Sequence, residues 1–293
     1  MHVPKGIICP LATPLDDEER VDVATLRRLL DRILPEVDAV FVLGSSGEFP
    51  MLRETVAQEM VDATLAHVNG RVPVYVGVAD AGTGRAIDNL KRVARSGAAA
   101  VVATSPFYYP ISEQKALVEH FTRIAEASAL PLILYNIPQN TGIHLTPESV
   151  HRLAEHPNIV GIKDSWGDMI LFQEFLRARS ERFAVLQGRE QLAAVCLWLG
   201  CDGLVSTLAN FAPRMLRRLV TAVQGGNREE ALAAQRAVTD LAQIFNQGYW
   251  LVAMKAALAE LGLGTGRLAA PLPACTPEQR QRIRALLHSA DLL

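Results

Sequence analysis

Residues 132–163 read LILYNIPQNTGIHLTPESVHRLAEHPNIVGIK. Two short apolar runs, residues 132–135 (LILY) and 159–163 (IVGIK), flank a helical pattern at residues 147–155. Short runs of apolar and β-branched residues are typical of parallel strands that are buried on both faces. The stretch therefore predicts a strand–helix–strand unit with two parallel strands.

The same alternation recurs along the rest of the chain. Six further strands are expected at residues 6–11, 39–43, 74–78, 99–103, 184–187 and 203–206. Helices are expected at residues 22–34, 53–68, 83–96, 112–127, 168–178, 191–199 and 212–223. Eight such units favour a closed (β/α)8 TIM barrel of the α/β class. An open doubly wound sheet is the alternative, but no glycine-rich G-x-G-x-x-G loop follows the first strand.

Three more helical patterns, at residues 228–245, 250–261 and 277–288, have no strand between them. No low-complexity linker precedes them, so they are expected to form an appended helical layer. The predicted organisation is a catalytic barrel at residues 1–225 and a C-terminal three-helix extension at residues 226–293.

Composition narrows the class of function. The chain has 293 residues and a formal net charge of −2, without basic clusters, which argues against nucleic acid or an anionic membrane as a partner. The four cysteines show no metal-type spacing and the seven histidines form no ligand set, so neither a metal nor another cofactor is expected. The first residues lack the apolar run of a secretory signal, and a cytoplasmic protein is expected.

One of the five lysines has an unusual position. Lys163 ends an apolar strand, where burial favours the neutral amine that acts as a nucleophile. Lys5 lies in the N-terminal tail, and Lys91 and Lys115 lie in polar helical patterns. Lys255 falls in an apolar helix and is expected to extend its amine to solvent. Taken alone, Lys163 is better explained as an ordinary strand-end lysine that reaches water or pairs with Asp164.

Other polar groups are expected at the same end of the barrel. Ser45, Ser46 and Gly47 follow the second strand within a GSSGE turn at residues 44–48, Tyr108 follows the fourth, and Tyr135 ends the fifth. Catalytic groups of TIM barrels gather at the carboxyl ends of the strands. Each group has an ordinary structural explanation, as a turn or a packing aromatic, but their common placement favours an active site.

These segments resemble the dihydrodipicolinate synthase / N-acetylneuraminate lyase family of class I aldolases over nearly the whole chain. The matching motifs are PLATP at residues 10–14, GSSGE at 44–48, SPFYYP at 105–110, YNIP at 135–138, GIKD at 161–164 and NFAP at 210–213. The resemblance implies a barrel with a helical extension, assembled as a homotetramer that is a dimer of dimers.

The resemblance also implies roles for particular residues. Lys163 would form an imine with pyruvate or another 2-oxoacid, and Tyr135 would transfer protons. Ser45 and Ser46, with Gly47, would bind the pyruvate carboxylate, and Ser46 would also relay protons. Tyr108 would correspond to an aromatic residue that reaches the partner's site in some members. The backbone of two further residues, Gly188 and Val205, would line the pyruvate pocket.

One departure separates the chain from true dihydrodipicolinate synthases, which resemble Y-N-x-P-x-R-T-G after the fifth strand. Asn140 stands where that motif has arginine, so a cationic clamp for an acidic aldehyde is missing. The motifs look closer to 2-keto-3-deoxy sugar-acid aldolases, which release pyruvate and an aldehyde. Trp166 could stack on an apolar face of such a substrate.

Three alternatives to the sugar-acid aldolase remain open. The first is 4-hydroxy-tetrahydrodipicolinate synthase activity, in which pyruvate condenses with aspartate semialdehyde. The second is dehydration of a keto-deoxy sugar acid through the same imine. The third is a non-catalytic protein that binds oxoacids.

Overall fold

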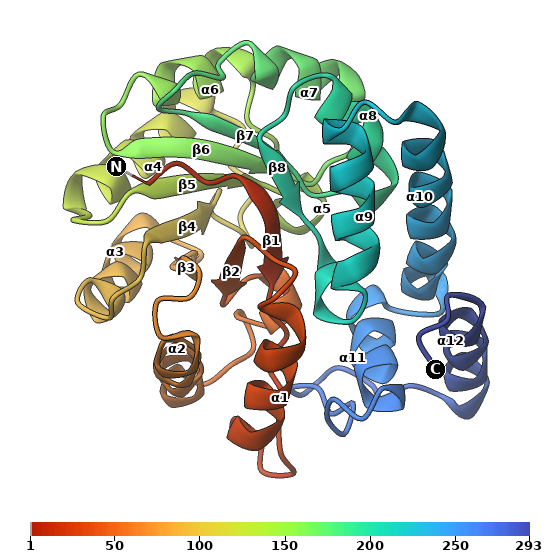
Figure 1. Ribbon diagram of the computed structural model, residues 1–293. Coiled ribbons are helices and arrows are strands. Elements are labelled where there is room, and N and C mark those ends of the chain that lie inside the picture. Colours follow the sequence, from red (N-terminus) through yellow and green to blue (C-terminus); the bar gives the residue numbers. More distant parts are fainter. Residues whose placement is uncertain (1) are drawn as a thin grey trace. The chain divides into compact units, whose positions relative to one another are not determined.

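The computed structural model describes residues 2–293, and Figure 1 shows the strands of the barrel with the helices that connect them. The strands are β1 (Gly6–Pro10), β2 (Ala39–Val42), β3 (Val74–Gly77), β4 (Ala100–Thr104), β5 (Leu132–Asn136), β6 (Ile159–Asp164), β7 (Ala184–Gln187) and β8 (Gly203–Val205). They follow one another in chain order around a closed barrel. The predicted TIM barrel is confirmed.

The connecting helices follow the strands as expected. They are α1 (Val23–Ile33), α2 (Glu54–Val68), α3 (Thr83–Val93), α4 (Gln114–Ala127), α6 (Pro147–Ala154), α7 (Met169–Leu176), α8 (Ala193–Trp198) and α9 (Pro213–Gln224). Short elements that the sequence did not predict are α5 (Pro138–Thr141) and the 3₁₀ turns η1 (Ser45–Gly47), η2 (Glu190–Leu192) and η3 (Thr207–Asn210). All four of these extra elements begin two or three residues after the last residue of a strand, at the end of the barrel where active sites form.

The C-terminal helices are α10 (Arg228–Leu241), α11 (Trp250–Glu260) and α12 (Pro277–Ser289). The helix expected at residues 228–245 ends earlier, because the chain tightens into the 3₁₀ turn η4 (Ala242–Asn246). α12 begins at a capping box, in which Thr276 and Gln279 each bind the backbone N–H of the other. None of the described helices is both long and apolar enough to span a membrane.

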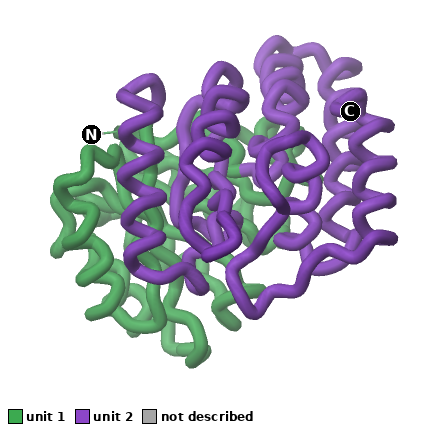
Figure 2. Tube along the Cα trace, turned by 90° about the horizontal axis from the view of Figure 1, so that it is seen from below, with its two compact units in different colours: residues 1–6, 73–205 green, residues 7–72, 206–293 purple. Residues whose placement is uncertain are grey.

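The chain forms two compact units, which Figure 2 shows in different colours. One contains Pro73–Val205 with the N-terminal residues up to Gly6, and the other contains Ile7–Val72 with Ser206–Leu293. Within the second unit, Leu26, Leu29, Leu30 and Ile33 of α1 are fully buried, as the apolar face of that helix predicts.

The expectation for Lys255 was wrong. Its side chain does not reach solvent from α11 but is 4% exposed and pairs with the Glu48 carboxylate at 2.8 Å. The apolar neighbours along α11 gave no sign of this partner, because Glu48 lies 207 residues away in sequence.

Candidate active site

Lys163 and Tyr135 form a buried pair on neighbouring strands. Their Cα atoms are register partners in the parallel pairing of β6 with β5, so their side chains point to the same face at the same level. The Lys163 Nζ lies 3.9 Å from the centroid of the Tyr135 ring. Lys163 is 5% exposed and Tyr135 is 4% exposed. An amine thus lies against an aromatic ring in a site nearly closed to water.

The next residues of the two strands form a second pair on the opposite face. Asn136 and Asp164 are also register partners, and the Asn136 Nδ2 donates to the Asp164 Oδ1 at 2.6 Å. Burial raises the pKa of the Asp164 carboxyl to about 6, although the Asn136 amide lowers it. Because side chains alternate along a strand, this pair joins β5 and β6 on the face opposite to the amine.

Gly188, just after β7, approaches Lys163 more closely than any residue with a side chain could. A Cβ at this position would lie 3.1 Å from the Lys163 Cε, 2.9 Å from the Asp164 carbonyl oxygen and 2.0 Å from the Ser165 Oγ. The Gly188 N–H donates to the same carbonyl at 2.7 Å and fixes the approach. Glycine is therefore required for packing beside the lysine stem.

Polar contacts also hold the loop that follows β6. The Ser165 carbonyl accepts hydrogen bonds from the Gln139 Nε2 at 2.6 Å and from the Arg189 Nε at 2.8 Å. Trp166 stacks on His144, with ring centroids 4.4 Å apart and planes 28° apart. At least one face of the indole expected to meet a substrate is thus covered by a ring of the protein itself.

The remaining expected residues of this unit differ in exposure. Tyr108 is 82% exposed, adopts a positive φ of 80° and packs edge-on against Tyr109 at 4.9 Å. Asn140 is exposed in the short helix α5, and Val205 is buried at the end of β8. A bulky residue with positive φ is uncommon and is stabilised by its surroundings or by function.

The serine loop, defined as residues 44–48, is a tight turn in the other compact unit. Ser45 is half-buried, whereas Ser46 and Gly47 are buried. The Gly47 N–H donates to the Gly44 carbonyl at 3.0 Å and the Glu48 N–H to the Ser45 carbonyl at 3.1 Å. These bonds fold the backbone so that two adjacent hydroxyl groups lie on one turn.

Two neighbouring segments hold the serine loop. The Ser46 Oγ lies 3.2 Å from the Thr207 Oγ1, and the Thr13 Oγ1 donates to the Gly47 carbonyl at 2.8 Å. A Cβ on Gly47 would lie 3.0 Å from the Leu11 carbonyl oxygen, so this glycine permits close approach of the end of β1. The loop is thus fixed by the PLATP segment and by η3.

Within the first unit the structure brings together Lys163, Tyr135 and Gly188, but it leaves Tyr108 and Asn140 on the surface. Sequence reasoning missed Asn136 and Asp164 as partners, although both stand in quoted motifs. The hint in the sequence was their position, since Asn136 and Asp164 each directly follow the last residue of an expected strand.

Among residues 2–293, no three His, Cys, Asp or Glu side chains gather so that they could hold a metal ion. The chemistry available in the described residues is that of an amine, phenol and hydroxyl groups, and a buried carboxyl.

Comparison with known proteins gives relatives over the full length. A family described as the dihydrodipicolinate synthetase family matches residues 3–290. An uncharacterized DapA-like lyase of Halobacterium salinarum is 36% identical, covering 98% of this chain and 94% of its own. A 4-hydroxy-tetrahydrodipicolinate synthase of Xanthomonas campestris is also 36% identical, with 98% and 95% covered.

A solved structure shares the fold. The crystal structure of YagE, a prophage protein of the dihydrodipicolinic acid synthase family from E. coli in complex with pyruvate, is 27% identical. It superposes with a TM-score of 0.94 over 99% of both chains. The match along the whole sequence agrees with the barrel. The chain therefore belongs to the dihydrodipicolinate synthetase family and is a pyruvate-dependent class I lyase of the aldolase type.

Proposed function

We propose that Lys163 forms an imine with a 2-oxoacid and that the enzyme cleaves a 2-keto-3-deoxy sugar acid reversibly to pyruvate and an aldehyde. Imine formation is supported by one observation: the Lys163 amine is buried at the end of β6 and lies 3.9 Å from the centroid of the Tyr135 ring. A lysine amine held at a strand end in this way can attack the carbonyl carbon of a 2-oxoacid.

The proposed reaction balances without a redox partner. In the synthetic direction the Lys163 amine adds to the C2 carbonyl of pyruvate, and loss of water with uptake of one proton gives a protonated imine; that proton is returned when the amine is released. Its positive nitrogen accepts electron density when C3 loses a proton, and the resulting enamine forms a carbon–carbon bond to the aldehyde. The aldehyde oxygen takes up a proton, and water then releases the product from the lysine. Cleavage follows the same steps in reverse.

The other residues take roles that the family suggests. Tyr135 transfers protons to and from the carbinolamine and the aldol hydroxyl. Ser45 and Ser46, with the close approach that Gly47 permits, bind the carboxylate of the oxoacid, and Ser46 also relays protons. Gly188 and Val205 line the pyruvate subsite with their backbone. The role of Gly188 is supported by its contact with the Lys163 stem.

The sugar-acid substrate is favoured by Asn140. An uncharged amide exposed in α5 can bind the hydroxyl groups of a polyol, but it does not replace the bidentate arginine that suits an acidic aldehyde. The Xanthomonas relative is a 4-hydroxy-tetrahydrodipicolinate synthase, which favours that activity as the second candidate. Dehydration of a keto-deoxy sugar acid would use the same imine.

Two assays test the proposal. After borohydride reduction with pyruvate, a stable adduct is expected on Lys163, and Lys163→Ala should abolish it. In a coupled assay, pyruvate release is expected from at least one member of a panel of 2-keto-3-deoxy sugar acids. No release from the panel, together with condensation of pyruvate and aspartate semialdehyde, would establish the second candidate instead. Loss of the sugar acid without pyruvate release would identify a dehydratase.

The assembly and location belong to the same proposal. A homotetramer built as a dimer of dimers is supported by the exposed pair Tyr108 and Tyr109, whose rings suit a subunit contact. We place this enzyme in the cytoplasm, in line with its four free cysteines. A sedimentation velocity experiment that gave a single monomeric species would contradict the tetramer.

A further inference from the structure

The serine loop ends on a buried glutamate that the proposed chemistry does not use. Glu48 is 0% exposed, and its φ of 61° places it in the left-handed region. A residue with a side chain is strained in this region and stays there only where its surroundings hold it. Because Glu48 directly follows Gly47, whatever holds Glu48 also sets the backbone of the loop.

Both oxygens of the Glu48 carboxylate are held by the C-terminal part of the chain. The Oε1 accepts a hydrogen bond from the Lys255 Nζ at 2.8 Å, and the Oε2 accepts one from the Ala269 N–H at 2.7 Å. Lys255 lies in α11, and Ala269 lies in the loop between α11 and α12. The carboxylate therefore cannot rotate without losing a partner.

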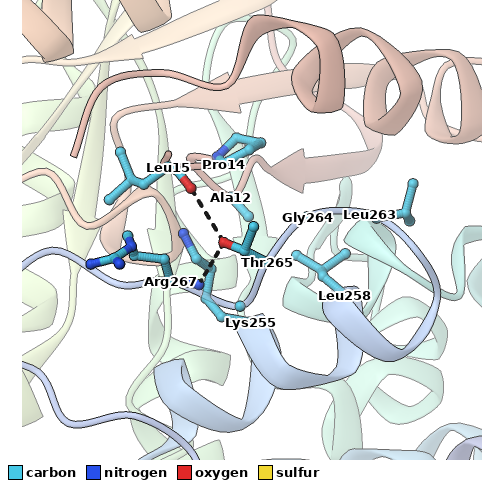
Figure 3. A pocket seen from close by; sticks show the side chains of 10 residues that line it. Ala12, Pro14, Leu15, Lys255, Leu258, Leu263, Gly264, Thr265 and Arg267 are labelled. Carbon is cyan, nitrogen blue, oxygen red and sulfur yellow. Dashed lines mark hydrogen bonds between the residues drawn. The ribbon is translucent and has the colours of Figure 1, made fainter. Parts of the chain in front are cut away.

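Lys255 also connects the loop to the PLATP segment. Its ammonium donates a second hydrogen bond to the Thr13 carbonyl oxygen. The Thr13 hydroxyl in turn donates to the Gly47 carbonyl at 2.8 Å. A closed ring of contacts thus joins Gly47, Glu48, Lys255 and Thr13. Figure 3 shows Lys255 near Ala12, Pro14 and Leu15 and near the 263–267 loop, and these residues line a small pocket.

Stability alone is a weak explanation for a buried ion pair. Taking two charges out of water offsets much of their attraction, and well-packed apolar residues are often as stable. Such a pair fixes the positions of the groups that it joins, since the ammonium and both carboxylate oxygens must stay within hydrogen-bond distance of their partners. Here the residue that is held in position is Glu48, which has a strained backbone and lies two positions after Ser46.

We propose that Lys255 is a positioning residue, which through Glu48 and Thr13 holds the serine loop so that Ser45 and Ser46 recognise the carboxylate of the oxoacid. The inference rests on the proposed imine function and adds a role for the C-terminal extension. Loosening the ring should weaken recognition of the carboxylate and leave the amine of Lys163 able to react. The affected quantity is therefore the preference for pyruvate over a ketone that lacks a carboxylate.

Borohydride trapping with pyruvate and with acetone measures this preference. The adduct on Lys163 is quantified by mass spectrometry across a range of concentrations of each ketone. The test variant is the double substitution Lys255→Met/Glu48→Gln, which removes both charges together and leaves no unpaired buried charge. We expect the pyruvate concentration for half-maximal trapping to rise at least tenfold, and that for acetone to change less than twofold.

Two further variants separate positioning from a general loss of structure. Thr13→Val breaks the ring without altering a charge and is expected to shift trapping in the same direction; it decides the outcome where the double variant does not fold. Leu287→Ala opens a cavity in α12, which packs on α11, without touching the ring. This control is expected to lower the thermal midpoint and to keep the wild-type preference for pyruvate.

The outcomes distinguish the two proposals. A wild-type protein that gives no adduct with either ketone refutes the imine function, and this inference falls with it. A wild-type adduct together with an unchanged preference in the folded variants refutes the inference alone. An equal loss of preference in Leu287→Ala would also overturn it, because the effect would then follow stability and not the ring.

Discussion

Gly188→Ala tests the packing around Lys163 with a single methyl group. The added Cβ would lie 2.0 Å from the Ser165 Oγ, 2.9 Å from the Asp164 carbonyl oxygen and 3.1 Å from the Lys163 Cε. The serine hydroxyl can rotate away, but the carbonyl belongs to β6 and cannot. The Gly188 N–H is bonded to that same carbonyl at 2.7 Å, so the glycine backbone cannot retreat without losing the bond.

The expected cost follows from the two contacts that rotation of the serine does not relieve. Overpacking by one methyl group in a buried site costs about 1–3 kcal/mol. The Lys163 stem must shift to relieve these contacts. A shift that costs the imine about 1.4 kcal/mol lowers the equilibrium constant for imine formation about tenfold. We therefore expect a lower thermal midpoint and at least a tenfold higher pyruvate concentration for half-maximal borohydride trapping.

Two companion variants sharpen the assay. Gly188→Ala/Ser165→Ala removes the shortest contact and should recover part of the stability but not the trapping. Gly84→Ala in α3 places a methyl group where no heavy atom lies within 4 Å, and it should trap pyruvate as the wild type does. A folded Gly188→Ala protein with wild-type pyruvate dependence would refute the requirement for glycine beside the lysine.

Three other predictions concern the neighbouring groups and the extension. Tyr135→Phe keeps the ring beside Lys163 but lacks the hydroxyl, so borohydride trapping should persist. Exchange of the pyruvate methyl protons with D₂O, followed by NMR, should slow by a factor of roughly 10²–10⁴. An exchange rate within a few-fold of wild type would contradict this prediction. Because the Asp164 pKa is raised from 3.8 to about 6, the folded state binds more protons than the unfolded state between these values. The free energy of unfolding of the wild type should fall by up to about 3 kcal/mol as pH rises from 4 to 7.5, whereas Asp164→Asn should lack this loss in urea titrations at the two pH values. An equal change with pH in both proteins would contradict this prediction. Thr276→Ala removes half of the capping box with Gln279 and should cost about 1 kcal/mol, seen as a lower thermal midpoint, and an unchanged midpoint would count against it.

The order of strands and helices was predictable because it depends on local patterns. Each buried strand carries its own apolar run, and α1 shows its buried face in the spacing of its leucines. Boundaries moved by one to four residues, and the largest shift is at η4, where a helix tightened into a 3₁₀ turn. Lys163 could be singled out for the same reason, since it ends an apolar run in its own strand.

Contacts between distant residues were not predictable in this way. The pairing of Asn136 with Asp164 depends on the register of β5 and β6, and the local sequence of either strand does not reveal that register. Lys255 looked like a surface lysine of an apolar helix, because its partner Glu48 is more than two hundred residues away. The need for glycine at position 188 likewise depends on where the Lys163 stem passes.

By itself the sequence determined the barrel, its helical extension and the lysine at the end of β6, since hydrophobic periodicity and chain order act over neighbouring residues. Only the tertiary structure decided that Tyr135 lies 3.9 Å from the lysine amine and that the serine loop is tied to α11. These contacts depend on strand register and on burial of charges from separate segments, which become defined only when the chain is folded.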